Sequence, residues 1–216
     1  MESLDYEFEP LPMAYMLNAD VPEEMVRHLN GYLDRLREDD NKQSNADTLV
    51  GQISHGEQLR INHKCKELKE FNLMILGLGR EYIKRFSQFS DVTFGSAREP
   101  EMCEVWSVHS YAGDYNPIHD HGTRTLMGIS FTMWTKVPDQ ITETPLDNAS
   151  RHCDGNLIFR YGETCAIDPE RLKPSQQMNV IPSVGKLLMF PSWLNHMVYP
   201  FEGEGERRTI AGNLNV

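Results

Sequence analysis

The sequence predicts a mainly β fold with N-terminal helices, of the α+β class, in which a double-stranded β-helix of the jelly-roll or cupin-like type forms the core. Short β-rich runs separated by turn signals follow one another after residue 101, with no helical pattern between them. Before that point, apolar residues recur at helical spacing instead. A chain of 216 residues has the length of one domain. We therefore expect residues 1–100 to be a helical support for a β core at residues 101–216.

Two helices are expected in the N-terminal part of the chain. The first covers about residues 22–41 and the second about residues 63–86, where leucine, phenylalanine and tyrosine form one apolar stripe. Both helices should pack across the outer face of a sheet. Residues 1–19 are expected to lie extended on the surface, and residues 49–59 show no pattern that assigns them to a helix or a strand.

The expected strands are short, and turn residues such as glycine, proline and aspartate separate them. Two connections, at residues 136–156 and 162–177, are long for hairpins. Loops of this length in a compact domain are usually functional or mobile, so we expect them to flank the entrance to a site. The expected strands cover residues 103–111, 126–134, 156–160, 178–181, 186–190, 197–199 and 207–216.

The composition limits the classes of partner. The formal net charge is −11, from 32 acidic and 21 basic side chains, and this excess argues against nonspecific binding to nucleic acids or anionic membranes. No apolar run approaches the ~18 residues of a membrane span. The four cysteines form no Cys-x-x-Cys pair, and no basic-then-apolar leader follows Met1. We therefore expect free thiols and a cytoplasmic protein that binds neither nucleic acid nor membrane.

Three histidines are candidate metal ligands. His119 and His121 are two residues apart, and on an extended segment residues i and i+2 point to the same face, as two ligands of one metal must. His196 follows an apolar run that ends in a Pro-Ser-Trp turn. Imidazole binds zinc, copper and iron. A His-x-His pair alone is common, however, and two surface histidines near a turn are the alternative interpretation.

The last predicted strand has two different faces. One face is small and polar and carries Arg207, Thr209, Ala211 and Asn213. The other face is apolar apart from Arg208 and should pack on the helices. A single arginine that faces the inside of a barrel needs an anion, because an unpaired buried charge is very costly. A buried structural salt bridge is the alternative for Arg207.

Four stretches of the chain together resemble a known family. They are residues 111–121, which read Tyr-Ala-Gly-Asp-Tyr-Asn-Pro-Ile-His-Asp-His, and residues 154–159, 188–196 and 206–213. On these stretches the chain resembles the iron(II)- and 2-oxoglutarate-dependent dioxygenases, in particular the bacterial and phage 2OG-Fe(II) oxygenases, with prolyl-hydroxylase-like enzymes as more distant relatives. The resemblance covers residues 101–216, a little over half of the chain, and implies that they form a catalytic core.

The resemblance implies that His119 and His196 bind the iron. The usual first pair of the family is His-x-Asp, part of a site of two histidines and one carboxylate, but here the second position is His121. A catalytic metal site of three histidines is therefore our first expectation. Strand alternation points Asp120 away from the metal, and Asp120 in place of one histidine is the alternative.

The resemblance also implies where the co-substrate binds. Arg207 matches the arginine that pairs with the far carboxylate of 2-oxoglutarate, and a guanidinium can bind a carboxylate through two hydrogen bonds. Thr209 lies two residues further along the same face and is expected beside the co-substrate. Tyr111 matches a tyrosine that often contacts the co-substrate, and ordinary aromatic packing is its alternative role.

The function that the resemblance implies is hydroxylation of a substrate, with Fe(II) as the metal, 2-oxoglutarate as the co-substrate, dioxygen as the oxidant and ascorbate as an accessory reductant. The 2-oxoglutarate would be decarboxylated to succinate. The substrate would be a small molecule or a peptide, and the sequence identifies neither the substrate nor the oligomeric state. The alternative is a cupin-like three-histidine metalloprotein, either an oxygenase without 2-oxoglutarate or a non-enzymatic metal-binding or interaction protein. Such proteins do not need a cation on the last strand, so Arg207 favours the first interpretation.

Overall fold

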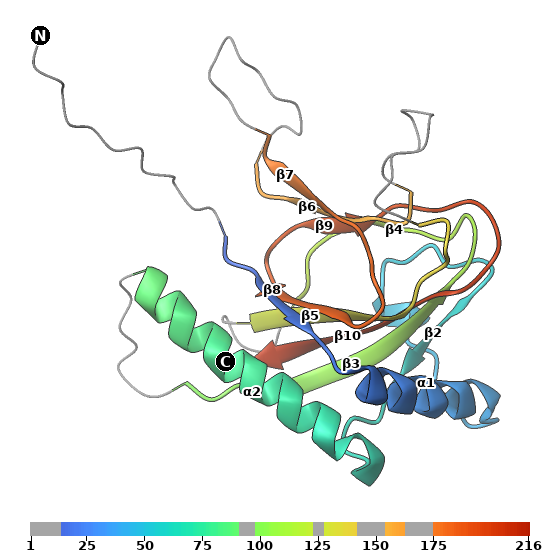
Figure 1. The fold of residues 1–216 in the computed structure, drawn as a ribbon, viewed down its shortest axis with the longest axis horizontal. Coiled ribbons are helices and arrows are strands. Elements are labelled where there is room, and N and C mark those ends of the chain that lie inside the picture. Colours follow the sequence, from blue (N-terminus) through green and yellow to red (C-terminus); the bar gives the residue numbers. More distant parts are fainter. Residues whose placement is uncertain (1–13, 91–97, 123–127, 142–153, 163–174) are drawn as a thin grey trace, which may run out of the picture.

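The chain folds into two antiparallel sheets that face each other, with both helices on the outside of the larger sheet (Figure 1). The computed structural model describes residues 14–90, 98–122, 128–141, 154–162 and 175–216. The two layers confirm the predicted α+β fold with a jelly-roll core. In spatial order, the larger sheet contains β1 (Leu17–Asp20), β8 (Lys186–Pro191), β5 (Gly128–Lys136), β10 (Arg207–Asn215), β3 (Glu101–Ser110) and β2 (Glu57–Arg60), and the smaller sheet contains β4 (Asn116–His119), β9 (His196–Val198), β6 (Leu157–Arg160) and β7 (Gln177–Val180).

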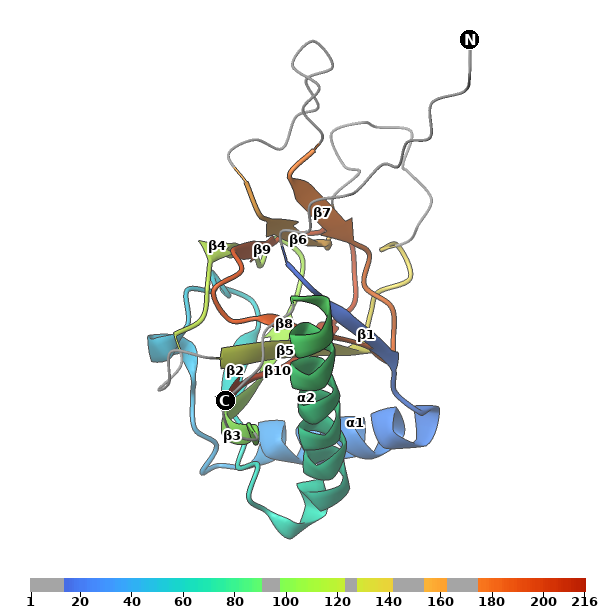
Figure 2. The same cartoon turned by 90° about the vertical axis from the view of Figure 1, so that its left-hand side faces the viewer.

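Helices α1 (Glu23–Glu38) and α2 (Lys69–Phe89) pack on the face of the larger sheet that points away from the smaller sheet. In Figure 2 the smaller sheet is at the top, α1 lies below the larger sheet and α2 crosses in front of it. Helix α1 lies within its predicted range. Helix α2 begins later than predicted, because a turn and the short 3-10 helix η2 (Lys66–Leu68) precede it. In that turn the N–H of Lys64 donates to the side-chain oxygen of Asn62 at 3.2 Å, a local bond that competes with helix formation.

Two edge strands of the larger sheet come from the N-terminal part of the chain and were not predicted. β1 pairs with β8, and β2, which follows the 3-10 helix η1 (Ala46–Thr48), pairs with β3. Each strand is 4 residues long, too short to show a clear alternation, so pairing within the sheet and not local propensity stabilises it. Residues 17–20 therefore lie in the sheet, whereas the sequence suggested an extended surface segment.

Strand β4 was missed for a different reason. Its four residues include Pro117, and a proline within so short a run indicates a turn or an edge strand. β4 is an edge strand of the smaller sheet. Its ladder with β9 joins Asn116 to Val198 and His119 to His196, with a register shift between the two pairs.

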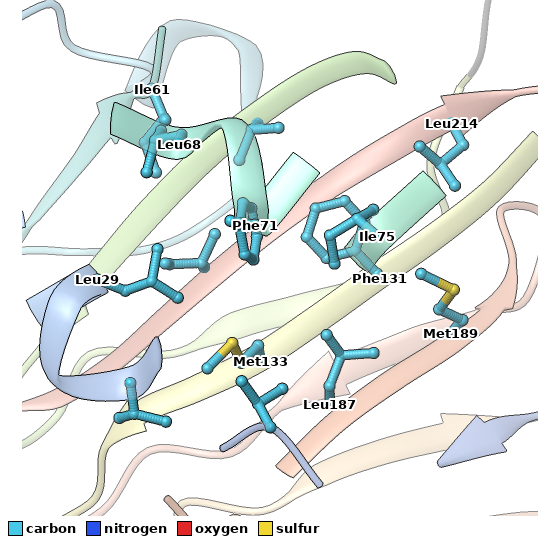
Figure 3. Close-up of a cluster of buried hydrophobic side chains, with 14 of the residues drawn as sticks. Leu29, Ile61, Leu68, Phe71, Ile75, Phe131, Met133, Leu187, Met189 and Leu214 are labelled. Carbon is cyan, nitrogen blue, oxygen red and sulfur yellow. The ribbon is translucent and has the colours of Figure 1, made fainter. Parts of the chain in front are cut away.

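The main hydrophobic core fills the space between the helices and the larger sheet. Its buried residues are 0–8% exposed, and a fully buried side chain of this kind contributes about 1.5–3 kcal/mol. The helices thus hold the outer face of the sheet in place and leave the inner face for a site. Figure 3 shows Leu29 of α1 and Phe71 and Ile75 of α2 against Phe131, Met133, Leu187, Met189 and Leu214 of the strands.

Strand β10 alternates between this core and the space between the sheets. Ile210 and Leu214 pack against the helices, whereas Arg207, Thr209 and Ala211 line a cavity on the opposite face. This confirms the predicted alternation of the last strand.

Other expectations can be compared only in part. Cys65 and Cys103 carry free thiols, as predicted, whereas Cys153 and Cys165 lie outside the described residues. The same holds for most of the two long connections that were expected to flank the site. Over the described ranges, no helix combines the length and the apolar character needed to cross a membrane.

Candidate active site

Three histidines converge between the two sheets. His119 is the last residue of β4 and His196 the first of β9, and the two are directly opposed in the register of this strand pair. His121 follows two residues after His119. One imidazole nitrogen from each of the three residues lies within 4.8 Å of the other two. The sequence predicted this convergence, and Asp120, which is exposed, is not part of the cluster.

Backbone carbonyls hold two of the rings. The Nδ1–H of His119 donates to the carbonyl oxygen of Pro117 at 2.7 Å, and the Nδ1–H of His196 donates to that of Leu194 at 2.9 Å. A carbonyl oxygen can only accept, so each ring carries its proton on Nδ1 and keeps a free lone pair on Nε2. Partners of this kind orient metal-binding histidines in general.

Side chains hold the third ring. The Nδ1 atom of His121 lies 2.9 Å from Ser130 Oγ and 2.9 Å from Asn213 Oδ1. Trp106 packs edge-on against the same ring, with the two centroids 5.5 Å apart. Strand alternation predicted Asn213 on the polar face of the last strand but indicated no role for it, and neither Ser130 nor Trp106 was predicted as a site residue. The two-residue alternation of β3 and β5, the two strands beside β10, could have predicted Trp106 and Ser130 as residues of this face.

Burial favours the neutral form of all three imidazoles. Burial, together with the neighbouring His119, lowers the pKa of His121 to about 4. Burial also lowers the pKa of His196 well below its ordinary value and reduces the pKa of His119. Neutral imidazole is the form that binds metals. Three neutral imidazoles suit a first-row transition metal such as Fe(II), so the donor set fits the metal that the resemblance implies.

The cavity that the histidines line also contains Arg207 and Thr209. Arg207 is only 3% exposed, and its Nε atom has no hydrogen-bond partner. Burial lowers the pKa of this guanidinium to about 10. Its carbon atom lies 6.0 Å from the centroid of the Trp134 ring. Within the described ranges no carboxylate pairs with Arg207, so the alternative of a structural salt bridge finds no support there.

The neighbouring Arg208 is buried as well but is fully paired. Its Nε and Nη2 atoms donate to the two carboxylate oxygens of Glu206, each at 2.8 Å, and Nη2 also lies 2.7 Å from Asp34 of α1. Arg208 therefore has its counter-ions on the helical side of the sheet, whereas Arg207 faces the cavity and has no carboxylate partner in the part of the chain that the structure describes. The alternation of a strand gives two adjacent arginines two different environments.

One aromatic residue lies elsewhere than the resemblance implied. Tyr111 is not among the cavity-lining residues, and its side chain interacts with Arg37 of α1 instead. Trp134 is buried in the core, whereas Trp193 is 58% exposed. Of the predicted co-substrate contacts, the structure therefore brings Arg207 and Thr209 to the cavity and leaves Tyr111 outside its lining.

Comparison with known proteins agrees with the fold and identifies the family. The family described as "Putative 2OG-Fe(II) oxygenase" matches residues 104–213, a range that contains the three histidines, Arg207 and Thr209. No curated protein sequence matches the chain.

Solved structures of 2-oxoglutarate-dependent oxygenases share the fold. A prolyl-4-hydroxylase from Pseudomonas putida aligns with a TM-score of 0.55 at 13% identity, over 93% of this chain and 91% of that one. The viral collagen prolyl hydroxylase of Paramecium bursaria Chlorella virus-1, in complex with 2-oxoglutarate, gives 0.53 at 14% identity, over 94% and 97%. HygX from Streptomyces hygroscopicus, with nickel and 2-oxoglutarate bound, gives 0.56 at 12% identity, over 94% and 83%.

The similarity to these structures is a similarity of fold. The family match shows that the amino-acid sequence is similar as well, over half of the chain. The three converging histidines are compatible with the iron that this family uses. The chain therefore belongs to the 2OG-Fe(II) oxygenase family and is a dioxygenase that depends on Fe(II) and 2-oxoglutarate.

Proposed function

We propose that His119, His121 and His196 bind Fe(II) through their Nε2 atoms, and that Arg207 binds the far carboxylate of 2-oxoglutarate beside Thr209. The observation that carries this proposal is the state of Arg207, which lines the cavity of the histidines with its Nε atom buried and unpaired. A buried cation needs an anion, and the co-substrate of this family is a dicarboxylate.

The side chains around the cavity would orient the co-substrate and exclude water. The Trp134 ring beside the guanidinium of Arg207 restricts its orientation. The hydroxyl of Thr209 can donate a hydrogen bond to the same carboxylate. Apolar side chains, among them Val108 and Leu157, line the rest of the wall, and the low local dielectric strengthens the attraction between Arg207 and a carboxylate. Bound Fe(II) would supply the redox chemistry that couples decarboxylation of 2-oxoglutarate to oxidation of the substrate.

The competing function is a cupin-like metalloprotein that uses the three histidines without 2-oxoglutarate. In such a protein the buried charge of Arg207 would have no bound anion to compensate it, and its desolvation would cost several kcal/mol of stability. The position of Arg207 beside Thr209 in the cavity supports the co-substrate site instead.

For the substrate we propose a neutral or basic peptide or small molecule. The net charge of −11 disfavours the approach of a polyanion. Two apolar side chains close in sequence to the candidate ligands or their partners are exposed: Ile118, which precedes His119, is 48% exposed, and Trp193 is 58% exposed. Trp193 follows Ser192, whose backbone carbonyl accepts a hydrogen bond from the backbone N–H of His121 at 2.9 Å. Of the similar structures, the viral enzyme is named a collagen prolyl hydroxylase, and HygX is known with hygromycin B bound.

We also propose that residues 1–100 and 101–216 are parts of one domain, the first supporting the second. The pairing of β1 with β8 and of β2 with β3 supports this organisation. The core shared by α1, α2 and the larger sheet supports it as well.

The test is succinate formation by the purified protein with Fe(II), 2-oxoglutarate and dioxygen. We expect a slow basal turnover that needs both Fe(II) and 2-oxoglutarate, and a stimulation by the substrate together with a product that has gained one oxygen atom. The panel contains a peptide library, amino acids, neutral metabolites and single-stranded oligonucleotides. Oxygen uptake that needs the metal but not 2-oxoglutarate would support the cupin-like alternative. Stimulation by oligonucleotides alone would refute the proposed substrate class.

A further inference from the structure

Among the three clustered histidines, His121 is the one whose Nδ1 contacts side chains instead of a backbone carbonyl. Its neighbours there are Ser130 and Asn213. A hydroxyl can donate or accept, and an amide side chain can present either its oxygen or its NH₂ group. These two contacts alone therefore do not decide which ring nitrogen of His121 carries the proton.

Glu104 decides it. The Nδ2 atom of Asn213 donates to Glu104 Oε1 at 3.0 Å. A carboxylate can only accept, so the NH₂ group of Asn213 must face Glu104 and its Oδ1 must face His121. The Ser130 hydroxyl donates to the same Oδ1 at 2.8 Å, which uses the hydroxyl proton. The Oδ1 atom can only accept, so His121 must carry its proton on Nδ1 and leave Nε2 free.

The sheet register fixes this row of side chains. Asn213 of β10 is paired with Glu104 of β3 on one side and with Ser130 of β5 on the other. Asn213 is 2% exposed and Ser130 is fully buried. Glu104 is only partly buried and borders a second, solvent-open pocket of about 720 Å³. Water can therefore reach the carboxylate, which reduces the cost of placing a charge there.

We propose that Glu104 and Asn213 are positioning residues of the metal site. The carboxylate of Glu104, acting through the amide of Asn213, fixes the Nδ1-protonated tautomer of His121 and so presents Nε2 to Fe(II). This inference rests on the proposed role of His121 as a ligand. A three-histidine site lacks the carboxylate of the two-histidine, one-carboxylate site. Here a carboxylate lies two hydrogen bonds from the third ring, and outer partners of this kind raise the basicity of a ligating imidazole.

Two variants and one control test the proposal. In Glu104→Gln the new amide can accept or donate, so Asn213 can take either orientation and His121 can take either tautomer. The double variant Glu104→Gln/Asn213→Asp places an acceptor-only group directly beside His121, and the introduced amide on β3 can donate to it. Glu101→Gln removes an exposed carboxylate from the same strand and is the control.

Two measurements report how each substitution changes the metal site. Nitrogen-15 NMR of the metal-free protein reports which ring nitrogen of His121 is protonated, and Fe(II) titration reports the affinity. For Glu104→Gln we expect a mixture of His121 tautomers and an affinity about 10-fold lower. The double variant should restore the single tautomer and most of the affinity, and Glu101→Gln should behave as the wild type. Thermal unfolding of each metal-free variant verifies that the fold is retained.

The outcomes separate this inference from the proposed function. An unchanged His121 tautomer in Glu104→Gln overturns the inference, and so does an affinity that is equally low in the single and the double variant, because that result indicates lost packing. Wild-type protein that binds no Fe(II) refutes the ligand role of His121. The NMR result on metal-free protein tests the role of Glu104 in either case.

Discussion

His119 and His196 are directly opposed across the β4–β9 pair, with ring centroids 4.3 Å apart. Cross-strand partners in an antiparallel pair have Cβ atoms about 4.5–5.5 Å apart, so the register of two strands sets the separation of these two candidate ligands. A slip of one residue would turn one ring to the other face of the sheet. The protein should therefore hold the two rings in place before the metal binds.

Replacing His196 by alanine should abolish tight Fe(II) binding while the fold survives. The change removes one of three proposed ligands, so we expect the affinity to fall by more than about 100-fold, beyond the loss typical of outer partners. Metal titration measures the affinity, and circular dichroism verifies the fold. The control is His28→Ala, which removes an exposed histidine of α1 and should bind Fe(II) as the wild type does. An unchanged Fe(II) affinity in His196→Ala would refute the assignment of the three histidines as metal ligands.

Arg207 and Arg208 are adjacent, but their substitutions should have different effects. Arg207→Met removes from the cavity a buried cation that has no carboxylate partner among the described residues, so 2-oxoglutarate binding should weaken by about 100-fold or more with no loss of thermal stability. Arg208→Met removes the partner of Glu206 and Asp34, so stability should fall by about 3 kcal/mol with 2-oxoglutarate affinity retained. Calorimetric titration and thermal unfolding measure the two effects. If Arg208→Met weakens 2-oxoglutarate binding more, the strand register is wrong.

Glu206 should make the stability depend on pH in the acid range. Burial alone would raise the pKa of Glu206, but hydrogen bonds from His109 and Arg208 outweigh it and hold the pKa well below its usual range. A depressed folded-state pKa means that the stabilisation is present above the unfolded-state pKa of about 4.3 and is lost as the pH falls towards the folded-state value. Glu206→Gln should therefore be less stable than the wild type by about 3 kcal/mol near neutral pH.

The difference between Glu206→Gln and the wild type should shrink as the pH falls below about 4, because Glu206 of the unfolded wild type then takes up a proton while the folded state keeps the carboxylate ionised down to lower pH. Urea unfolding of both proteins across this range measures it. A difference that stays constant from neutral to acid pH would show that Glu206 does not stabilise the fold through its charge.

The helices should support the core without taking part in metal binding. Phe71 of α2 is 1% exposed, and its ring lies 6.2 Å from that of Phe131 on β5. Phe71→Ala should destabilise the protein by about 3–5 kcal/mol without changing the stoichiometry of Fe(II) binding. Leu73→Ala, on the same helix but 58% exposed, should cost less than about 0.5 kcal/mol. Denaturant unfolding compares the two, and equal losses would contradict the supporting role of the buried face.

The parts of the site that the sequence predicted depend on local backbone geometry. A period of two residues in a strand places His119 and His121 on one face and separates Arg207 from Arg208. The structure places these side chains accordingly. Each of these inferences needs only the dihedral angles of an extended segment, so a single sequence was sufficient.

The parts that the sequence did not predict depend on pairing between distant segments. Glu104 and Asn213 are separated by 109 positions and meet because β3 and β10 are paired in one register. The edge strands β1 and β2 form because a sheet is present to pair with, and β4 contains Pro117, which indicated a turn. No local pattern specifies such partners.

The most direct test of the account is titration of 2-oxoglutarate, in the absence of dioxygen, into wild-type protein with and without Fe(II) and into Fe(II)-loaded Arg207→Met. If the three histidines and Arg207 form one site, the wild type should bind a single 2-oxoglutarate per chain, tightly only when Fe(II) is present. The Arg207→Met protein should bind Fe(II) normally and 2-oxoglutarate weakly. Binding that is equally tight without the metal and in Arg207→Met would contradict the account, because the co-substrate would then occupy a different place.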